Sequence, residues 1–304
     1  MAGHGNSKIA VVAAIIGNLA IAVIKFVAAA ITGSSAMISE GIHSLVDTGN
    51  GALMLHGINQ SKKPADELHP FGYGKALYFW TMVVSVSIFG IGGGLSLYEG
   101  ISHIRHAGAE MYNPSVNYIV LALAFIIEGW SFSVAFRELR KAKGEKGTWQ
   151  YIKEAKDPST YTVVLEDSAA LLGLVFAFLG IFFGHLFGNP YLDGIASMLI
   201  GLLLMGVAFI LAFETRSLLL GEGVDVATLA DMRRRIESDP QVDSVAEILT
   251  MYVGPNDLLV NLGVYFKKGS TAEQVHESIH RIENNIRSAY PECLHIYIET
   301  ELLP

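Results

Sequence analysis

The chain is 304 residues long, 51% hydrophobic and only 16% charged, and its mean hydropathy is +0.41. Soluble domains carry about 25% charged residues, so this composition excludes an ordinary soluble protein and indicates a chain that lies largely in a bilayer. The formal net charge of -8 comes without a Lys/Arg-rich patch, which argues against nucleic acid as a partner. The single cysteine, Cys293, excludes a disulfide within one chain and a thiolate metal cluster.

Six apolar segments are long enough for the roughly 20 residues that a membrane helix needs. They are expected near residues 9–31, 37–58, 77–98, 116–137, 161–187 and 192–213. Because the first residues lack a signal-peptide cleavage pattern, the first segment is counted as a span. Residues 1–215 are therefore predicted to form a transmembrane domain of six helices.

Basic residues near the span ends predict the orientation of the chain. One side receives Lys8, the lysines of the 59–75 connection, the basic 137–156 connection and Arg216, whereas the other side receives only Arg105. Both termini are therefore expected in the cytoplasm, with the protein in a bacterial inner membrane.

Residues 216–304 have a different, charge-rich character. The pattern predicts a helix over 227–238, strands over 242–253 and 258–266, a helix ending at Ala289 and a last strand over 294–299. The second helix is expected to begin at a capping box over Ser270–Glu273. This order indicates a small α+β domain of the ferredoxin-like kind, which is expected in the cytoplasm.

The second apolar segment carries four polar side chains on one helix face, namely Glu40, His43, Asp47 and Asn50. His43 and Asp47, at i and i+4, can present an imidazole and a carboxylate to one ion. Ionisable groups at membrane depth are costly and usually mark an ion or proton path. Asn50 continues the face, although a hydrogen bond between packed helices would explain it equally well.

The fifth apolar segment carries the adjacent carboxylates Glu166 and Asp167. Neighbouring residues on a helix point about 100° apart, so the two are not expected to meet one ion symmetrically. Of the other charged residues in the apolar segments, Lys25 lies inside the first and Glu128 inside the fourth. Lys25 is interpreted as a counter-charge or as a side chain that extends to the interface.

Four stretches carry a resemblance to a known family: SEGIHSLVD at 39–47, HPFGYGK at 69–75, LDGIAS at 192–197 and IYIE at 296–299. Over nearly its whole length the chain resembles the cation diffusion facilitators. The resemblance implies six spans, a ferredoxin-like tail and proton-coupled export of divalent metals such as zinc. It also implies a homodimer formed through the tail.

The family's transport site uses a pair of ligands in the second span and a pair in the fifth. On this resemblance His43 and Asp47 form the first pair and Asp167 belongs to the second, while Val163 stands where the family usually has His or Asp. Glu166 or a water would replace the missing ligand. Loss of an imidazole makes the site richer in oxygen, which leaves manganese, cobalt or iron as alternatives to zinc.

The resemblance also implies secondary metal positions. Asp66 and His69 match those of the family's loop site, although Tyr73 stands where its second His would be. In the tail, His276 and Glu301 match two metal-binding positions.

No nucleotide-binding or hydrolase motif accompanies these residues, so the chain is expected not to be an enzyme and to need no cofactor. The function predicted is therefore efflux of a divalent metal, zinc first, by antiport with protons. A membrane metal sensor that binds through its tail without transporting is the alternative.

Overall fold

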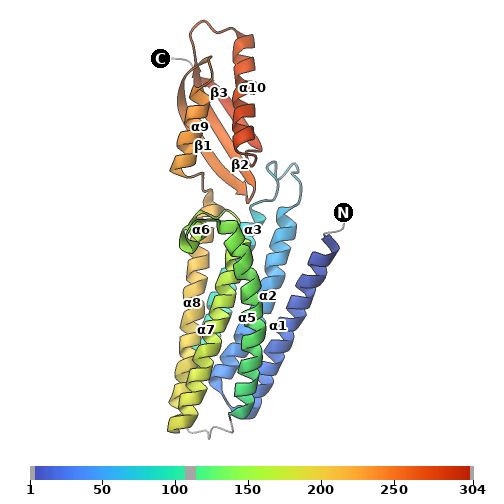
Figure 1. Ribbon diagram of the computed structural model, residues 1–304, viewed down its shortest axis with the longest axis vertical. Helices are drawn as coiled ribbons and strands as arrows, with labels where there is room; N and C mark the ends of the chain where they lie inside the picture. The colour runs from blue at the N-terminus through green and yellow to red at the C-terminus, as the bar shows by residue number, and fades with distance from the viewer. Residues whose placement is uncertain (1–3, 107–113, 302–304) are drawn as a thin grey trace. The chain divides into compact units, whose positions relative to one another are not determined.

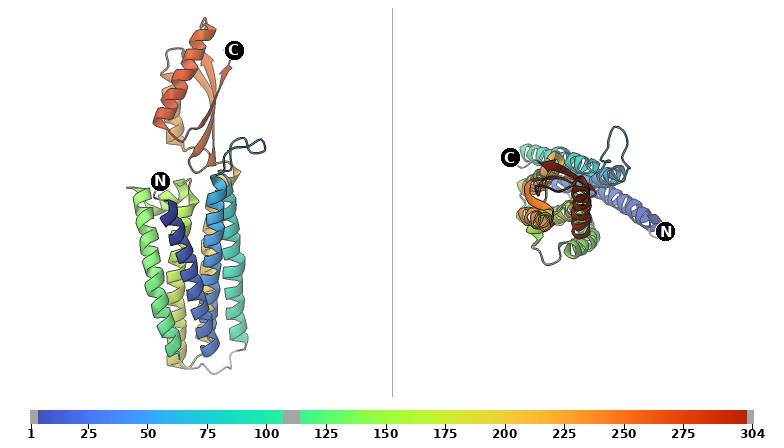
Figure 2. Two further views of the ribbon diagram at one scale, coloured as in Figure 1. Left: turned by 90° about the vertical axis from the view of Figure 1, so that its right-hand side faces the viewer. Right: turned by 90° about the horizontal axis from the view of Figure 1, so that it is seen from above.

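The computed structural model describes the backbone of residues 4–106 and 114–301, and the side chains of its first helix from Gly17 onward. Within these residues six long helical segments correspond to the six apolar segments (Figures 1 and 2). They are α1 (His4–Thr32), α2 (Ser35–Ser61), the continuous α3 (Ala76–Ser87), η1 (Ile88–Gly94) and α4 (Leu95–Arg105), α5 (Ser115–Lys143), α7 (Pro158–Phe187) and α8 (Tyr191–Leu220). The basic connection between α5 and α7 contains the short helix α6 (Thr148–Glu154). The side chain of Lys8, used above for orientation, lies outside the described residues.

Four of these segments are long and apolar enough to cross a membrane, as judged on the described residues: 76–105, 115–143, 158–187 and 191–220. The described apolar part of the first helix, Gly17–Thr32, is shorter. α2 is long enough, but Glu40, His43 and Asp47 lower its hydropathy. The helix that carries the predicted metal ligands is therefore not among the four most clearly apolar spans.

The start of α2 is held by a carboxylate from another helix. Asp193, in the first turn of α8, accepts hydrogen bonds from the hydroxyl of Ser34 at 2.7 Å and from the backbone N–H of Ser35 at 2.5 Å. A carboxylate satisfies the free N–H groups of a helix N-terminus and interacts favourably with the helix dipole. Gly33, at φ 66°, makes the tight turn out of α1. The LDGIAS motif thus fixes where α2, the helix with the predicted metal ligands, begins.

The third span contains a seven-residue π-helix, η1, over the glycine-rich run Ile88–Gly94. Glycines bring this span close to α8: a Cβ at Gly93 would meet the carbonyl oxygen of Gly201 at 2.9 Å, and one at Gly100 would meet that of Gly194 at 2.6 Å. Small residues at such contacts let two membrane helices pack closely. The third and sixth spans therefore pack backbone against backbone.

The chain divides into two compact units, 1–58 with 78–215 and 59–77 with 216–304. The predicted boundary gave all of the first 215 residues to one domain, whereas the connection after α2 packs with the second unit. Gly74 lies so close to the strand β1 (Val242–Gly254) that a Cβ there would meet the Val253 carbonyl oxygen at 2.5 Å. Phe71 packs edge to face against His295, with ring centroids 5.2 Å apart.

The second unit has the predicted order helix, strand, strand, helix, strand: α9 (Val226–Glu237), β1 (Val242–Gly254), β2 (Asp257–Phe266), α10 (Ala272–Ala289) and β3 (His295–Glu301). β1 and β2 are antiparallel, and β2 and β3 are parallel. α10 begins one residue later than predicted, because the capping box is formed by Thr271 and Gln274.

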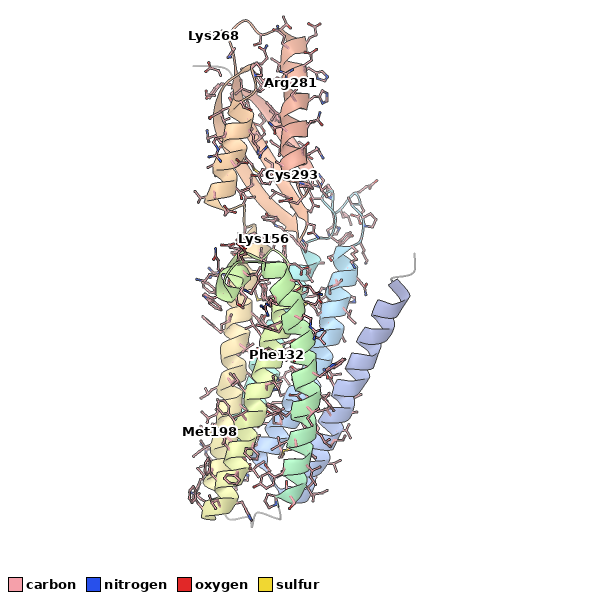
Figure 3. The ribbon with its side chains drawn as sticks, viewed as in Figure 1. Phe132, Lys156, Met198, Lys268, Arg281 and Cys293 are labelled. Carbon is pink, nitrogen blue, oxygen red and sulfur yellow. The ribbon has the colours of Figure 1, made fainter. Side chains whose placement is uncertain are left out.

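The core of the second unit lies between the two helices and one face of the sheet, where Met232 and Ile236 of α9 meet Ile282 and Ile286 of α10. Cys293 is fully buried in this core (Figure 3). Burial raises the pKa of its thiol to about 12, so the cysteine is a neutral core residue.

Candidate metal site

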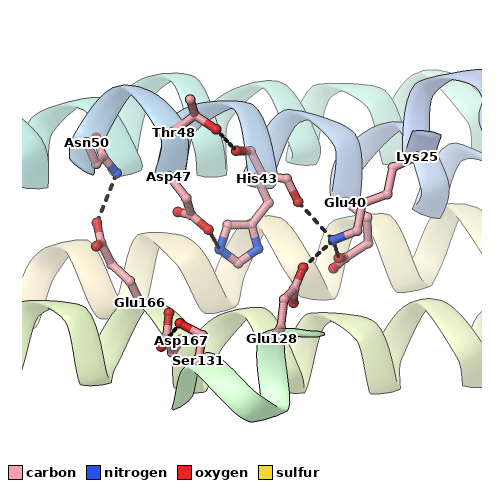
Figure 4. Close-up of polar contacts among 11 residues, drawn as sticks. Lys25, Glu40, His43, Asp47, Thr48, Asn50, Glu128, Ser131, Glu166 and Asp167 are labelled. Atoms are coloured by element: carbon pink, nitrogen blue, oxygen red, sulfur yellow. Dashed lines mark hydrogen bonds and ion pairs between the residues drawn. The ribbon is translucent and has the colours of Figure 1, made fainter. Parts of the chain in front are cut away.

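The four polar side chains of α2 lie on one face and form a ladder that runs along the bundle (Figure 4). In its middle, His43 Nε2 lies 3.2 Å from Asp47 Oδ2. His43 is 3% exposed and the Asp47 side chain is 20% exposed. The i,i+4 spacing thus brings an imidazole and a carboxylate together inside the membrane unit, as predicted.

The two carboxylates of α7 turn towards different helices (Figure 4). Glu166 Oε1 accepts a hydrogen bond from Asn50 Nδ2 of α2 at 3.0 Å. Asp167 Oδ2 accepts one from Ser131 Oγ of α5 at 3.1 Å. This divergence follows from their adjacency on one helix. It gives Asn50 an interhelical hydrogen bond and a partner among the candidate ligands.

Across the part of the chain that the structure describes, no three His, Cys, Asp or Glu side chains converge closely enough to hold a metal ion. The conformation therefore pairs His43 with Asp47 and keeps Glu166 and Asp167 on protein donors. Metal binding by all four would require both α7 carboxylates to exchange those donors for the ion.

A pocket of about 370 Å³ lies between α2, α5 and α7. Its lining includes Asn50, Glu166, Val163 and, on α5, Glu138. Val163, 39% exposed, therefore lies in the same pocket as Glu166. The Asn50–Glu166 pair therefore borders a pocket, one helical turn from Asp47.

The sequence did not predict that the row of polar side chains on α2 continues, beyond His43, to charged residues of other helices. Lys25, fully buried on α1, donates to Glu40 Oε2 at 2.8 Å and to Glu128 Oε1 at 2.8 Å. Lys25 is thus a counter-charge and does not extend to the interface. Burial of a paired Lys cannot be inferred from one helix, because its partners come from two others. A charged residue in each of two apolar segments, Lys25 and Glu128, was the available signal.

The loop pair Asp66 and His69 also comes together, with His69 Nδ1 3.2 Å from Asp66 Oδ1. Asp66 Oδ2 accepts a hydrogen bond from the Tyr73 hydroxyl at 2.6 Å. That bond, with a backbone bond from His69, holds the pKa of Asp66 below its ordinary value. The Tyr73 hydroxyl therefore bonds to the Asp66 carboxylate. By the family resemblance, a second His would stand at this position and share a metal ion with that carboxylate.

The tail residues His276 and Glu301 lie on opposite sides of their unit. His276 is on the exposed face of α10, where its Nε2 lies 3.2 Å from His280 Nε2. Glu301 is paired in register with Tyr265 and projects from the sheet face that the helices leave open. The two side chains cannot share an ion within one chain in this arrangement.

The long apolar helices, joined to a small α+β unit, indicate an integral membrane protein with a His–carboxylate pair buried among its helices. Residues 11–220 match the family model described as the cation efflux transmembrane domain, and residues 224–302 match the cation efflux protein cytoplasmic domain. The chain therefore belongs to the cation efflux family, the cation diffusion facilitators. The predicted family and fold class, membrane helices followed by a ferredoxin-like cytoplasmic domain, are confirmed.

The chain is 35% identical over 252 residues to the mouse (Mus musculus) "Proton-coupled zinc antiporter SLC30A9, mitochondrial", which covers 82% of this chain and 44% of that relative. It is 30% identical to "Metal tolerance protein C4" of Arabidopsis thaliana, with 82% and 55% covered. It thus spans about half the length of these curated relatives. Magnetosome protein MamM of Paramagnetospirillum magneticum is 27% identical, with 93% and 85% covered. The solved "MamM CTD - Copper form" is 18% identical, covers 26% of this chain and 87% of its own, and has a TM-score of 0.24.

Proposed function

We propose that the chain exports a divalent metal ion in exchange for protons, with zinc as its main substrate. The observation that carries the proposal is the buried His43–Asp47 pair, 3.2 Å apart, in a cation efflux chain. Metal binding needs a neutral imidazole and ionised carboxylates, so metal and protons compete for the same atoms. The mouse relative, named a proton-coupled zinc antiporter, supports this choice of ions.

Asp167 is proposed as the third ligand and Glu166 as the fourth, in place of a side chain at Val163. An arriving ion enters through the pocket, displaces Asn50 from Glu166 and recruits Asp167 from Ser131. One imidazole and three carboxylates form a hard, oxygen-rich set that also suits manganese, cobalt or iron. Asp66, His69, His276 and Glu301 are retained as secondary metal positions outside this set.

Transport follows from alternating access. The site takes up metal and gives up protons while it faces the cytoplasm, and it is reprotonated and loses metal on the opposite side. In this proposal residues 1–215 form the transport domain and residues 216–304 the cytoplasmic domain. Both termini are placed in the cytoplasm and the protein in a bacterial inner membrane.

The second unit is proposed to join two chains into a homodimer. Its sheet has one face covered by α9 and α10 and one open face. On the open face Leu249, Asn261 and Tyr297 stand in one row, and Leu249 and Tyr297 are about half exposed. Exposed apolar side chains on a flat face favour association with a second copy.

The test is metal-driven proton flux in proteoliposomes with a pH reporter inside and zinc, manganese, cobalt or iron outside. Asp47→Asn and Asp167→Asn should each abolish flux, because each removes a charged ligand while keeping the side-chain volume. Thr48→Ala is the matched control, since the Thr48 hydroxyl only donates to the Ser44 carbonyl of its own helix, at 2.8 Å.

Normal flux in both Asn variants would overturn the proposed site. A wild-type chain that binds zinc without moving any ion would indicate a membrane metal sensor.

A further inference from the structure

The Lys25 ammonium is held as a coordinated cation. Its Nζ lies 2.8 Å from Glu40 Oε2, 2.8 Å from Glu128 Oε1 and 2.9 Å from Ser44 Oγ. An ammonium has three donors, so each of its hydrogens is directed to one oxygen. Glu40 and Ser44 come from α2 and Glu128 from α5, whereas the ammonium comes from α1. These three oxygen-bearing side chains, called the inner cage below, form a site for a single positive charge.

The inner cage adjoins the proposed metal site. Glu40 lies one helical turn before His43, and Ser44 directly follows it. The Glu128 carboxylate also acts electrostatically on both Asp47 and Asp167. Asp47 therefore lies beside Nε2 of the His43 imidazole, and the carboxylates of the inner cage lie on the other side of the ring (Figure 4).

Several acceptors around the inner cage are left over after Lys25 is satisfied. Glu40 Oε1, Glu128 Oε2 and His43 Nδ1 are buried, and none has a hydrogen-bond partner among the described residues. Glu40 is 0% exposed and His43 3% exposed. Buried polar atoms are normally paired, so an unpaired oxygen on each carboxylate of the inner cage indicates that the cage can accept a further ligand.

Two of these atoms face the same point on α7. Gly173 has no side chain there, and a Cβ built on it would lie 2.5 Å from Glu40 Oε1 and 3.8 Å from His43 Nδ1. The glycine thus leaves room for the Glu40 carboxylate beside the imidazole. The inner cage itself combines two carboxylates and a hydroxyl, oxygen ligands that suit a divalent metal such as Mn²⁺.

We propose that Glu40, Glu128 and Ser44 form a second cation subsite, which the Lys25 ammonium occupies as a tethered counter-ion. Lys25 keeps a second metal ion out and so limits the helical unit to the ion bound by His43, Asp47 and the α7 carboxylates. The inference rests on the proposed function only for its choice of a divalent metal as the competing cation.

The test counts Mn²⁺ bound per chain by equilibrium dialysis of the purified full-length protein, at saturation. Lys25→Met should bind one Mn²⁺ more than the wild type, because the inner cage loses its resident charge. Lys62→Met, which removes an exposed loop lysine, should leave the number unchanged. The double variant Lys25→Met/Glu128→Gln should return to the wild-type number, since it removes one carboxylate of the cage.

Chemical rescue covers a failure of Lys25→Met to fold. Lys25→Ala purified in methylammonium should stay folded. When the methylammonium is then removed by dialysis against Mn²⁺, the variant should bind one metal ion more per chain. Equal concentrations of methylammonium should displace that ion and sodium should not. A folded Lys25→Met that binds the wild-type number, or an extra ion that survives Glu128→Gln, would overturn the subsite. Wild-type flux is measured separately, so a chain without flux would contradict the transport proposal and leave the Mn²⁺ count informative.

Discussion

At the scale of single residues, Ser131 decides where the Asp167 carboxylate points. Its hydroxyl donates to Asp167 Oδ2 at 3.1 Å and so competes with a metal for that oxygen. Ser131→Ala should therefore tighten zinc binding roughly tenfold or more, since a hydrogen bond to a charged group contributes about 1.5–3 kcal/mol. The measurement is zinc titration calorimetry on the purified chain.

The matched control is Ser133→Ala, two residues further along α5. Ser133 donates to the Gly129 carbonyl within its own helix at 2.7 Å, so its loss should leave the affinity unchanged. Weaker zinc binding in Ser131→Ala would mean instead that Ser131 holds Asp167 in its metal-binding orientation.

The His43–Asp47 pair could be predicted from the sequence because both members lie on one helix, where spacing determines proximity. The partners of Lys25, Glu166 and Asp167 could not. Each pairing joins different helices, and hydrophobic periodicity does not determine how membrane helices are rotated or which of them are neighbours. The inner cage needs α1, α2 and α5 in contact, which no local pattern encodes.

At the scale of elements, the glycines of η1 are not equivalent. A Cβ at Gly93 would lie 2.6 Å from Met205 Cγ and 2.9 Å from the Gly201 carbonyl, whereas a Cβ at Gly90 would meet nothing within 4 Å. Gly93→Ala should therefore destabilise the helical unit by roughly 1–3 kcal/mol through overpacking against α8. Gly90→Ala is the control and should unfold at the wild-type temperature or slightly above, as followed by circular dichroism in detergent.

Equal thermal stability of the two alanine variants would show that η1 and α8 can separate without cost.

The π-helix itself could not be predicted, because an apolar run with glycines fits an ordinary span equally well. The helices and strands of the second unit could be placed to within one or two residues. Their signals are local: alternating burial, a turn at 254–257 and a capping residue.

At the scale of the whole molecule, the segment after α2 belongs to the second unit although it interrupts the first in sequence. Its packing depends on Gly74, which has to approach the β1 backbone closely, and on Phe71 against His295. The sequence of this polar, lysine-containing connection predicts an exposed loop of the membrane domain. Its attachment to the sheet arises from contacts between residues far apart in sequence, 179 positions for Gly74 and Val253 and 224 for Phe71 and His295, which composition cannot reveal.

In the proposed homodimer, the open sheet face is the surface through which two chains meet. If Leu249 and Tyr297 are covered by a second copy, a carboxylate at either position would be buried without a partner, which costs about 3 kcal/mol. Leu249→Glu and Tyr297→Glu should then weaken dimerisation about 100-fold or more. Val226→Glu is the control, because Val226 is 84% exposed at the start of α9, away from the open face.

Light scattering of the detergent-solubilised chain provides the measurement, with the micelle contribution subtracted. The wild type and Val226→Glu should have twice the 32.9 kDa mass of one chain, and both sheet variants should approach the single mass on dilution. A wild type that is already monomeric would contradict the dimer. If both sheet variants remain dimeric, the two chains must meet at another surface. The sheet face with its two half-exposed apolar residues would then be open to water in the dimer.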